Sequence, residues 1–62
     1  MTYVVLTADN YGHQLYLVFE TEELLQRYRL WEMFRNGHMS KCLIYEETYA
    51  DICTALADGN LF

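Results

Sequence analysis

Two runs of β-branched and aromatic residues decide the fold: Tyr3-Val4-Val5-Leu6-Thr7-Ala8 and Gln14-Leu15-Tyr16-Leu17-Val18-Phe19. The residues between them include Asp9-Asn10-Tyr11-Gly12, a composition typical of a turn. We therefore predict a β-hairpin with its loop at about residues 10–13. The pleat of this hairpin is expected to place one set of side chains on the core face, namely Val4, Leu6, Leu15, Leu17 and Phe19. The other face would then carry Tyr3, Val5, Thr7, Tyr16 and Val18.

A change of period after the hairpin predicts a first helix. Thr21 is expected to cap free backbone N–H groups, and the acids Glu22 and Glu23 suit the positive end of the helix dipole. The helix should continue to about Asn36, where Gly37 provides the left-handed residue that ends it.

The remainder of the chain predicts one more strand and one more helix. Residues 41–45, Lys-Cys-Leu-Ile-Tyr, form a short apolar run that suits a strand. Thr48 is a candidate helix cap, and Gly59 is expected to end the second helix. The helix between them has apolar residues at i, i+3, i+4 and i+7, which are Tyr49, Ile52, Cys53 and Leu56.

These elements predict an α+β fold with ββαβα topology in a single compact domain, residues 1–62. We expect a three-stranded antiparallel sheet in the order 2-1-3, because this order puts the most apolar strand in the centre. Both helices are expected on one face of the sheet. The opposite face would be left uncovered although it is rich in tyrosine.

Composition excludes several classes of protein. The chain has 62 residues, of which 53% are hydrophobic, so it should fold as one small domain and is not disordered. It has neither an apolar run long enough for a membrane span nor the start of a signal peptide, so we expect a cytoplasmic protein. The net charge of -5 disfavours binding to nucleic acid or anionic lipid and favours neutral or cationic partners.

The first predicted helix has more apolar residues than one packed face needs. At 100° per residue its apolar side chains spread over roughly 220°, so at least Leu30, Met33 or Phe34 should be exposed. A partner protein could cover this surplus, although scattered exposed apolar residues are also normal in monomers. The predicted partner-binding residues are Tyr16, Tyr28, Leu30, Trp31, Met33, Phe34 and Tyr45.

Catalytic and metal-binding motifs are not evident in the sequence, and we expect neither an enzyme nor a cofactor. Ser40 is the only serine and has no nucleophile-elbow glycines around it. His13, His38, Cys42 and Cys53 are possible zinc ligands, but they lack a Cys-x-x-Cys pair. Two buried free thiols fit the two cysteines best, and a Cys42–Cys53 disulfide is the alternative.

Charge is distributed in blocks along the chain. Residues 1–23 and 42–62 each carry four acids and no base, whereas residues 24–41 carry all four bases and one acid. The acids expected to steer a basic partner are Glu20, Glu22, Glu23, Glu46, Glu47 and Asp51. The basic segment 27–41, with Tyr28 and Trp31, could instead contact nucleic acid.

We therefore expect a small, acidic, non-enzymatic protein-binding module. An inhibitor that a phage or mobile element uses against a host nucleic-acid-handling enzyme, acting in the host cytoplasm, would suit these properties. The two alternatives are a self-assembling homodimeric module and a nucleic-acid-binding module that uses residues 27–41.

Overall fold

The computed structural model describes residues 1–61 and contains the five predicted elements in the predicted order. They are β1 (Thr2–Ala8), β2 (Gln14–Phe19), α1 (Glu22–Asn36), β3 (Cys42–Tyr45) and α2 (Tyr49–Ala57). The strands form one antiparallel sheet in the order β2-β1-β3, which confirms the predicted α+β class, topology and strand order.

Three of the four helix ends are formed by the residues that the sequence indicated, whereas α2 ends at Ala57 with Asp58, not Gly59, as its C-cap. Thr21 Oγ1 accepts a hydrogen bond from Leu24 N, and Gly37 adopts a left-handed φ of 76° at the end of α1. At α2, Thr48 Oγ1 accepts from Asp51 N and donates to the Asp51 carboxylate at 2.7 Å. Both caps supply acceptors for N–H groups that have no partner within the helix.

The predicted register of the hairpin is wrong by one residue. Val5 pairs with Leu17, so Val5 shares a face with Leu17, and Val4 shares the other face with Val18. The cause lies in the loop, which begins one residue earlier than predicted. Asp9 N donates to His13 O, and the Asp9 carboxylate accepts from the N–H groups of Tyr11 and His13. A shift of one residue moves every side chain of a strand to the other face.

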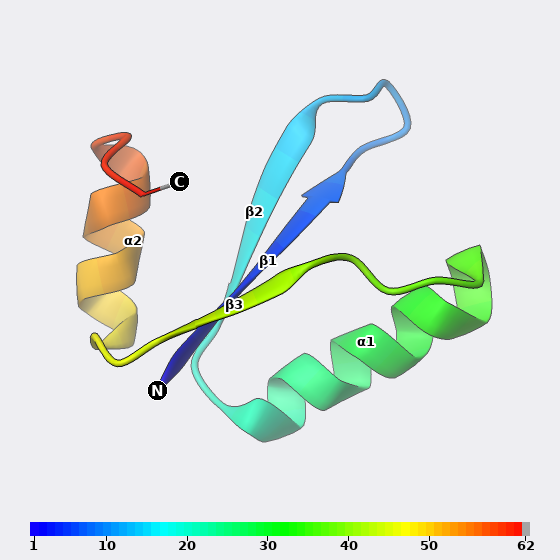
Figure 1. The fold of residues 1–62 in the computed structure, drawn as a ribbon, viewed down its shortest axis with the longest axis horizontal. Helices are drawn as coiled ribbons and strands as arrows, with labels where there is room; N and C mark the ends of the chain where they lie inside the picture. The colour runs from blue at the N-terminus through cyan, green and yellow to red at the C-terminus, as the bar shows by residue number, and fades with distance from the viewer. Residues whose placement is uncertain (62) are drawn as a thin grey trace.

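The two helices lie on opposite faces of the sheet, which corrects the prediction that both cover one face (Figure 1). α1 packs on the face of Val5 and Phe19, where the rings of Phe19 and Tyr28 are 5.3 Å apart. α2 packs on the face of Val4. Val4 and Val5 are neighbours in β1 and both are 0% exposed, which requires cover on both sides. The face opposite α1, which was predicted to have no helix on it, is therefore covered by α2 (Figure 1).

All three strands contribute side chains to each face of the sheet. The α1 face carries Tyr3, Val5, Thr7, Leu15, Leu17, Phe19, Cys42 and Ile44. The α2 face carries Thr2, Val4, Leu6, Tyr16, Val18, Leu43 and Tyr45. Buried apolar side chains are few among residues 1–61, and they are Val4, Val5, Leu25 and Ile52.

One carboxylate is buried between α1 and the segment that leads to β3. Glu32 is 1% exposed and accepts hydrogen bonds from Ser40 N at 2.7 Å, from Ser40 Oγ at 2.5 Å and from the Tyr28 hydroxyl at 3.3 Å. Burial alone would raise the pKa of Glu32, but the donors on Ser40 and Tyr28 together hold that pKa below its ordinary value. The charged side chain thus fixes the connection between α1 and β3 to the helix.

We predict that Glu32→Gln destabilises the fold by about 1–3 kcal/mol, because the amide places a donor where a carboxylate accepts three hydrogen bonds. Urea unfolding followed by circular dichroism measures the loss. Glu46→Gln removes an exposed carboxylate and should change stability by less than about 0.5 kcal/mol. Equal effects of the two substitutions would contradict the role of Glu32.

The lowered pKa of Glu32 also predicts an acid-dependent loss of stability. Its contribution is fully present above the ordinary glutamate pKa, about 4.3, and is lost as the pH falls through the lower value in the fold. Urea midpoints measured between neutral and acidic pH should therefore fall more steeply for the parent than for Glu32→Gln. Parallel curves would show that Glu32 is not the group responsible.

Candidate partner-binding surface

The outward side of α1 carries an apolar patch, which we call the outer α1 patch and which consists of Leu30, Trp31, Met33 and Phe34. All four side chains are exposed, Leu30 by 72% and Phe34 by 93%. The sequence prediction that this helix exposes part of its apolar surface is confirmed. Whether these residues bind a partner remains a prediction.

The patch exists because a different stripe of α1 faces the sheet. Leu25, Tyr28 and Glu32 follow one another at i, i+3 and i+7, and they are the residues turned inward. Leu30 and Phe34 are four residues apart on the side of the helix turned away from this stripe. A charged residue is therefore buried while two large apolar residues face the solvent.

Polar groups flank the outer α1 patch on two sides. Arg27 forms an ion pair with Glu23 at 3.0 Å on the helix surface. The guanidinium carbon of Arg35 lies 5.4 Å from the centre of a Trp31 ring, in a cation–π arrangement. Tryptophan and arginine, the two residues of this cation–π pair, are both enriched in binding hot spots.

The predicted tyrosines are not brought together with this patch. Tyr28 is half-buried between α1 and the sheet and donates to Glu32. Tyr16 and Tyr45 lie on the α2 face, on the other side of the sheet. The seven predicted binding residues thus belong to at least two separate surfaces, and the four exposed ones on α1 are those of the outer α1 patch.

The predicted steering acids are all exposed, and they gather at one end of the sheet. β2 and β3 both run antiparallel to β1, so α1 and α2 both start near the beginning of β1 (Figure 1). The neighbouring Cys53, burial and the Glu20 carboxylate each raise the pKa of Tyr49, which places Glu20 close to the start of α2. This acidic end consists of Glu20, Glu22, Glu23, Glu46, Glu47 and Asp51.

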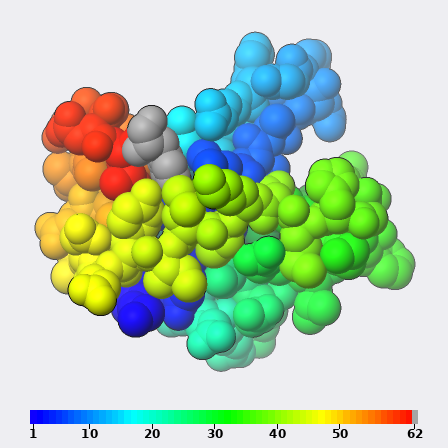
Figure 2. Space-filling view, viewed as in Figure 1, coloured from blue at the N-terminus to red at the C-terminus, as the bar shows by residue number. Residues whose placement is uncertain are grey.

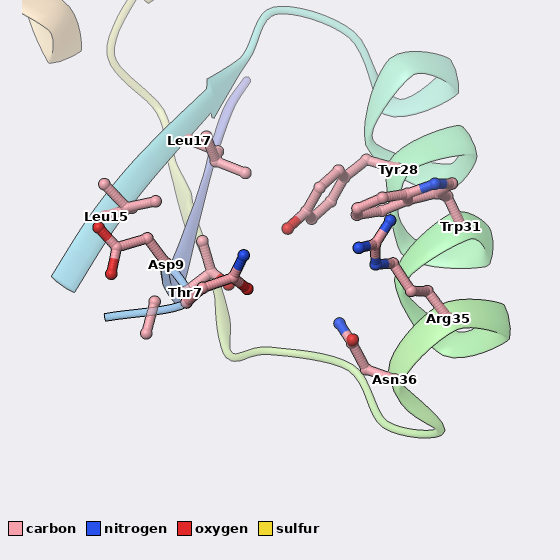
Figure 3. Close-up of a pocket in the computed structure, with 10 residues that line it drawn as sticks. Thr7, Asp9, Leu15, Leu17, Tyr28, Trp31, Arg35 and Asn36 are labelled. Atoms are coloured by element: carbon pink, nitrogen blue, oxygen red, sulfur yellow. The ribbon is translucent and has the colours of Figure 1, made fainter. Parts of the chain in front are cut away.

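A cleft lies near the opposite end of the sheet, between the hairpin and the last turns of α1 (Figures 2 and 3). Its volume is about 420 Å³. The lining residues are Thr7, Ala8, Asp9, Asn10, Leu15, Leu17, Tyr28, Trp31, Arg35 and Asn36. Sequence reasoning missed this cleft, because its walls come from three segments that only the corrected hairpin register places together.

The candidate metal ligands and thiols are dispersed. Cys42 and Cys53 are both free and half-buried, with Cys42 on the α1 face and Cys53 on α2. His13 contacts Asp9, and His38 lies beside the Asn36 carbonyl. Within residues 1–61, no three side chains of histidine, cysteine, aspartate or glutamate are grouped so that they could hold a metal ion.

Neither helix within residues 1–61 is long and apolar enough to cross a bilayer.

The chain was compared with known protein families, curated proteins and solved structures, and none of them matches it.

We predict that the exposed and buried apolar residues of α1 differ sharply in their effect on stability. Leu30→Gln and Phe34→Gln should each change the free energy of unfolding by no more than about 0.5 kcal/mol, because both side chains already face water. Leu25→Ala should cost about 2–5 kcal/mol, because Leu25 is buried. Urea unfolding of the three variants tests this contrast, and a large loss for Phe34→Gln would mean that the patch belongs to the core.

Proposed function

We propose that this chain is a non-enzymatic module that binds a larger protein through the outer α1 patch. The observation that carries this proposal is the exposure of Leu30 and Phe34 on the outward side of a well-capped helix. α1 has 15 residues and is about 22 Å long, which is enough to lie along a groove or helix of a partner. Burial of its apolar side chains would stabilise such a complex.

Charge supports a partner with a basic surface. The chain carries a net charge of -5, and six of its exposed acids gather at the acidic end. Such a field speeds encounter with a cationic surface and disfavours anionic ones. Grooves that hold nucleic acid are basic, so an acidic chain seated there would exclude the substrate. An inhibitor encoded by a phage or mobile element fits this mode of action.

The carboxylates with the most contacts support a non-enzymatic role. The Asp9 carboxylate accepts from backbone groups of its own loop, and Glu32 is enclosed by Ser40 and Tyr28. Both therefore have local structural tasks. They are held by partners that would compete with a substrate for the same oxygen atoms.

A second copy of the chain is the alternative partner, and the charges of α1 favour it over nucleic acid. α1 carries three acids and three arginines, so its own charge is balanced although the whole chain is acidic. Two α1 helices could pack antiparallel without strong repulsion. The arginines of α1 point in different directions, since Arg27 and Arg29 are about 200° apart around the helix. They do not form the single basic face that nucleic acid requires.

A double variant of the patch tests the function directly. We expect Leu30→Glu with Phe34→Glu to abolish recovery of the partner that the tagged parent captures from a host lysate, because two charges would face an apolar surface. Ala50→Glu adds an exposed charge to α2 and should leave capture unchanged. The captured protein is identified by mass spectrometry, and its interface is expected to be basic.

Analytical ultracentrifugation distinguishes the two kinds of partner. A parent chain that sediments as a monomer and loses its captured protein in the double variant supports the proposal. A parent dimer that the double variant converts to monomer assigns the patch to a second copy. If the double variant captures the same proteins as the parent and sediments like it, the outer α1 patch is not a binding surface.

A further inference from the structure

The cleft between the hairpin and α1 has the size and the lining of a small-molecule site. Its volume of about 420 Å³ falls in the range of ligand pockets. Leu15 and Leu17 of β2 form one apolar wall, and the rings of Tyr28 and Trp31 form the other (Figure 3). The amides of Asn10 and Asn36 add hydrogen-bonding groups to the lining.

Arg35 supplies a cation that has no ion pair with any residue from 1 to 61. Its guanidinium lies over Trp31 and lines the cleft, and no carboxylate of residues 1–61 comes within ion-pair distance of it. Arg27, on the same helix, is by contrast paired with Glu23 at 3.0 Å. A planar guanidinium stacked on an aromatic ring presents N–H groups that match a carboxylate.

Asp9 is the acidic residue that lines the cleft, and its carboxylate forms hydrogen bonds within its own loop. The Asp9 carboxylate accepts hydrogen bonds from the N–H groups of Tyr11 and His13, and Asp9 Oδ2 lies 3.1 Å from His13 Nδ1. Asp9 therefore holds the hairpin loop, while Arg35 remains the charged group available to a ligand. The negative charge of Asp9 would nevertheless repel a dianion more strongly than a monoanion.

We propose that the cleft binds a small aromatic monocarboxylate. The aromatic ring of the ligand packs between Trp31 and the leucines of β2, and its carboxylate pairs with Arg35. Apolar walls with one charged anchor give affinity from burial and orientation from the ion pair. The site is separate from partner binding by Leu30 and Phe34, although Trp31 borders both.

Phenylpropionate, which has an aromatic ring and one carboxylate, is a suitable probe. Trp31 is the only tryptophan of the chain, so tryptophan fluorescence reports on the wall of the cleft. We expect saturable binding in the millimolar range or tighter, detected by Trp31 fluorescence and by NMR shifts of the amides of Thr7 and Leu15. Phenylpropionamide keeps the ring and loses the charge, so it should bind the parent at least about tenfold more weakly. Arg35→Gln should weaken phenylpropionate binding by a similar factor.

Two control variants test whether the binding depends on the cleft itself. Arg27→Gln removes a cation outside the cleft and should leave binding unchanged, and so should Leu30→Glu with Phe34→Glu, even if that variant loses its protein partner. Absence of saturable binding would overturn the proposal, as would equal affinity for the amide, shifts outside the cleft, or tighter binding of phenyl phosphate.

Discussion

The burial of β1 on both faces is the constraint on which the rest of the structure depends. Val4 and Val5 are adjacent and therefore point to opposite sides of the sheet, yet neither has any exposed surface. Each face therefore needs cover, and the two helices found within residues 1–61 supply it. The result is three layers, α1, the sheet and α2, and among residues 1–61 no further helix or strand lies outside either helix (Figure 1). Apolar residues on the outward side of α1 consequently face the solvent.

Local chemistry explains why the elements could be predicted from sequence while the faces of the sheet could not. Caps such as Thr21 and Gly37 act on their own helix, and short-range patterns reveal them. The hairpin register depends on one loop residue, Asp9, whose carboxylate and backbone close the loop one position earlier than composition alone suggests. A single step in register exchanged Val4 for Val5 on the α1 face.

The burial of Glu32 is a second feature that could not be predicted from the sequence. In the sequence it is the only acid of a basic segment, and nothing marks it as buried. Its environment comes from Ser40, eight residues later, which supplies a backbone and a hydroxyl donor. The exposure of Leu30, Met33 and Phe34 was predictable, because an apolar arc of roughly 220° exceeds what one face of a helix can bury. The cleft was not predictable from the sequence, because it forms only when α1 and the hairpin are positioned next to each other.

The three surface features occupy different parts of the molecule, and this separation has a physical consequence. The acidic end lies where β1 begins, and the cleft lies where β1 ends. The outer α1 patch lies on α1, the helix that runs from the first region toward the second. A partner attracted by the acids at the start of α1 would meet Leu30 and Phe34 farther along the same helix. Long-range attraction and short-range apolar contact would then act in sequence on a single helix, the first affecting the rate of association and the second its lifetime. Trp31, with Arg35 over its ring, borders both the patch and the cleft, so a ligand in the cleft would change the edge of the surface that a partner contacts.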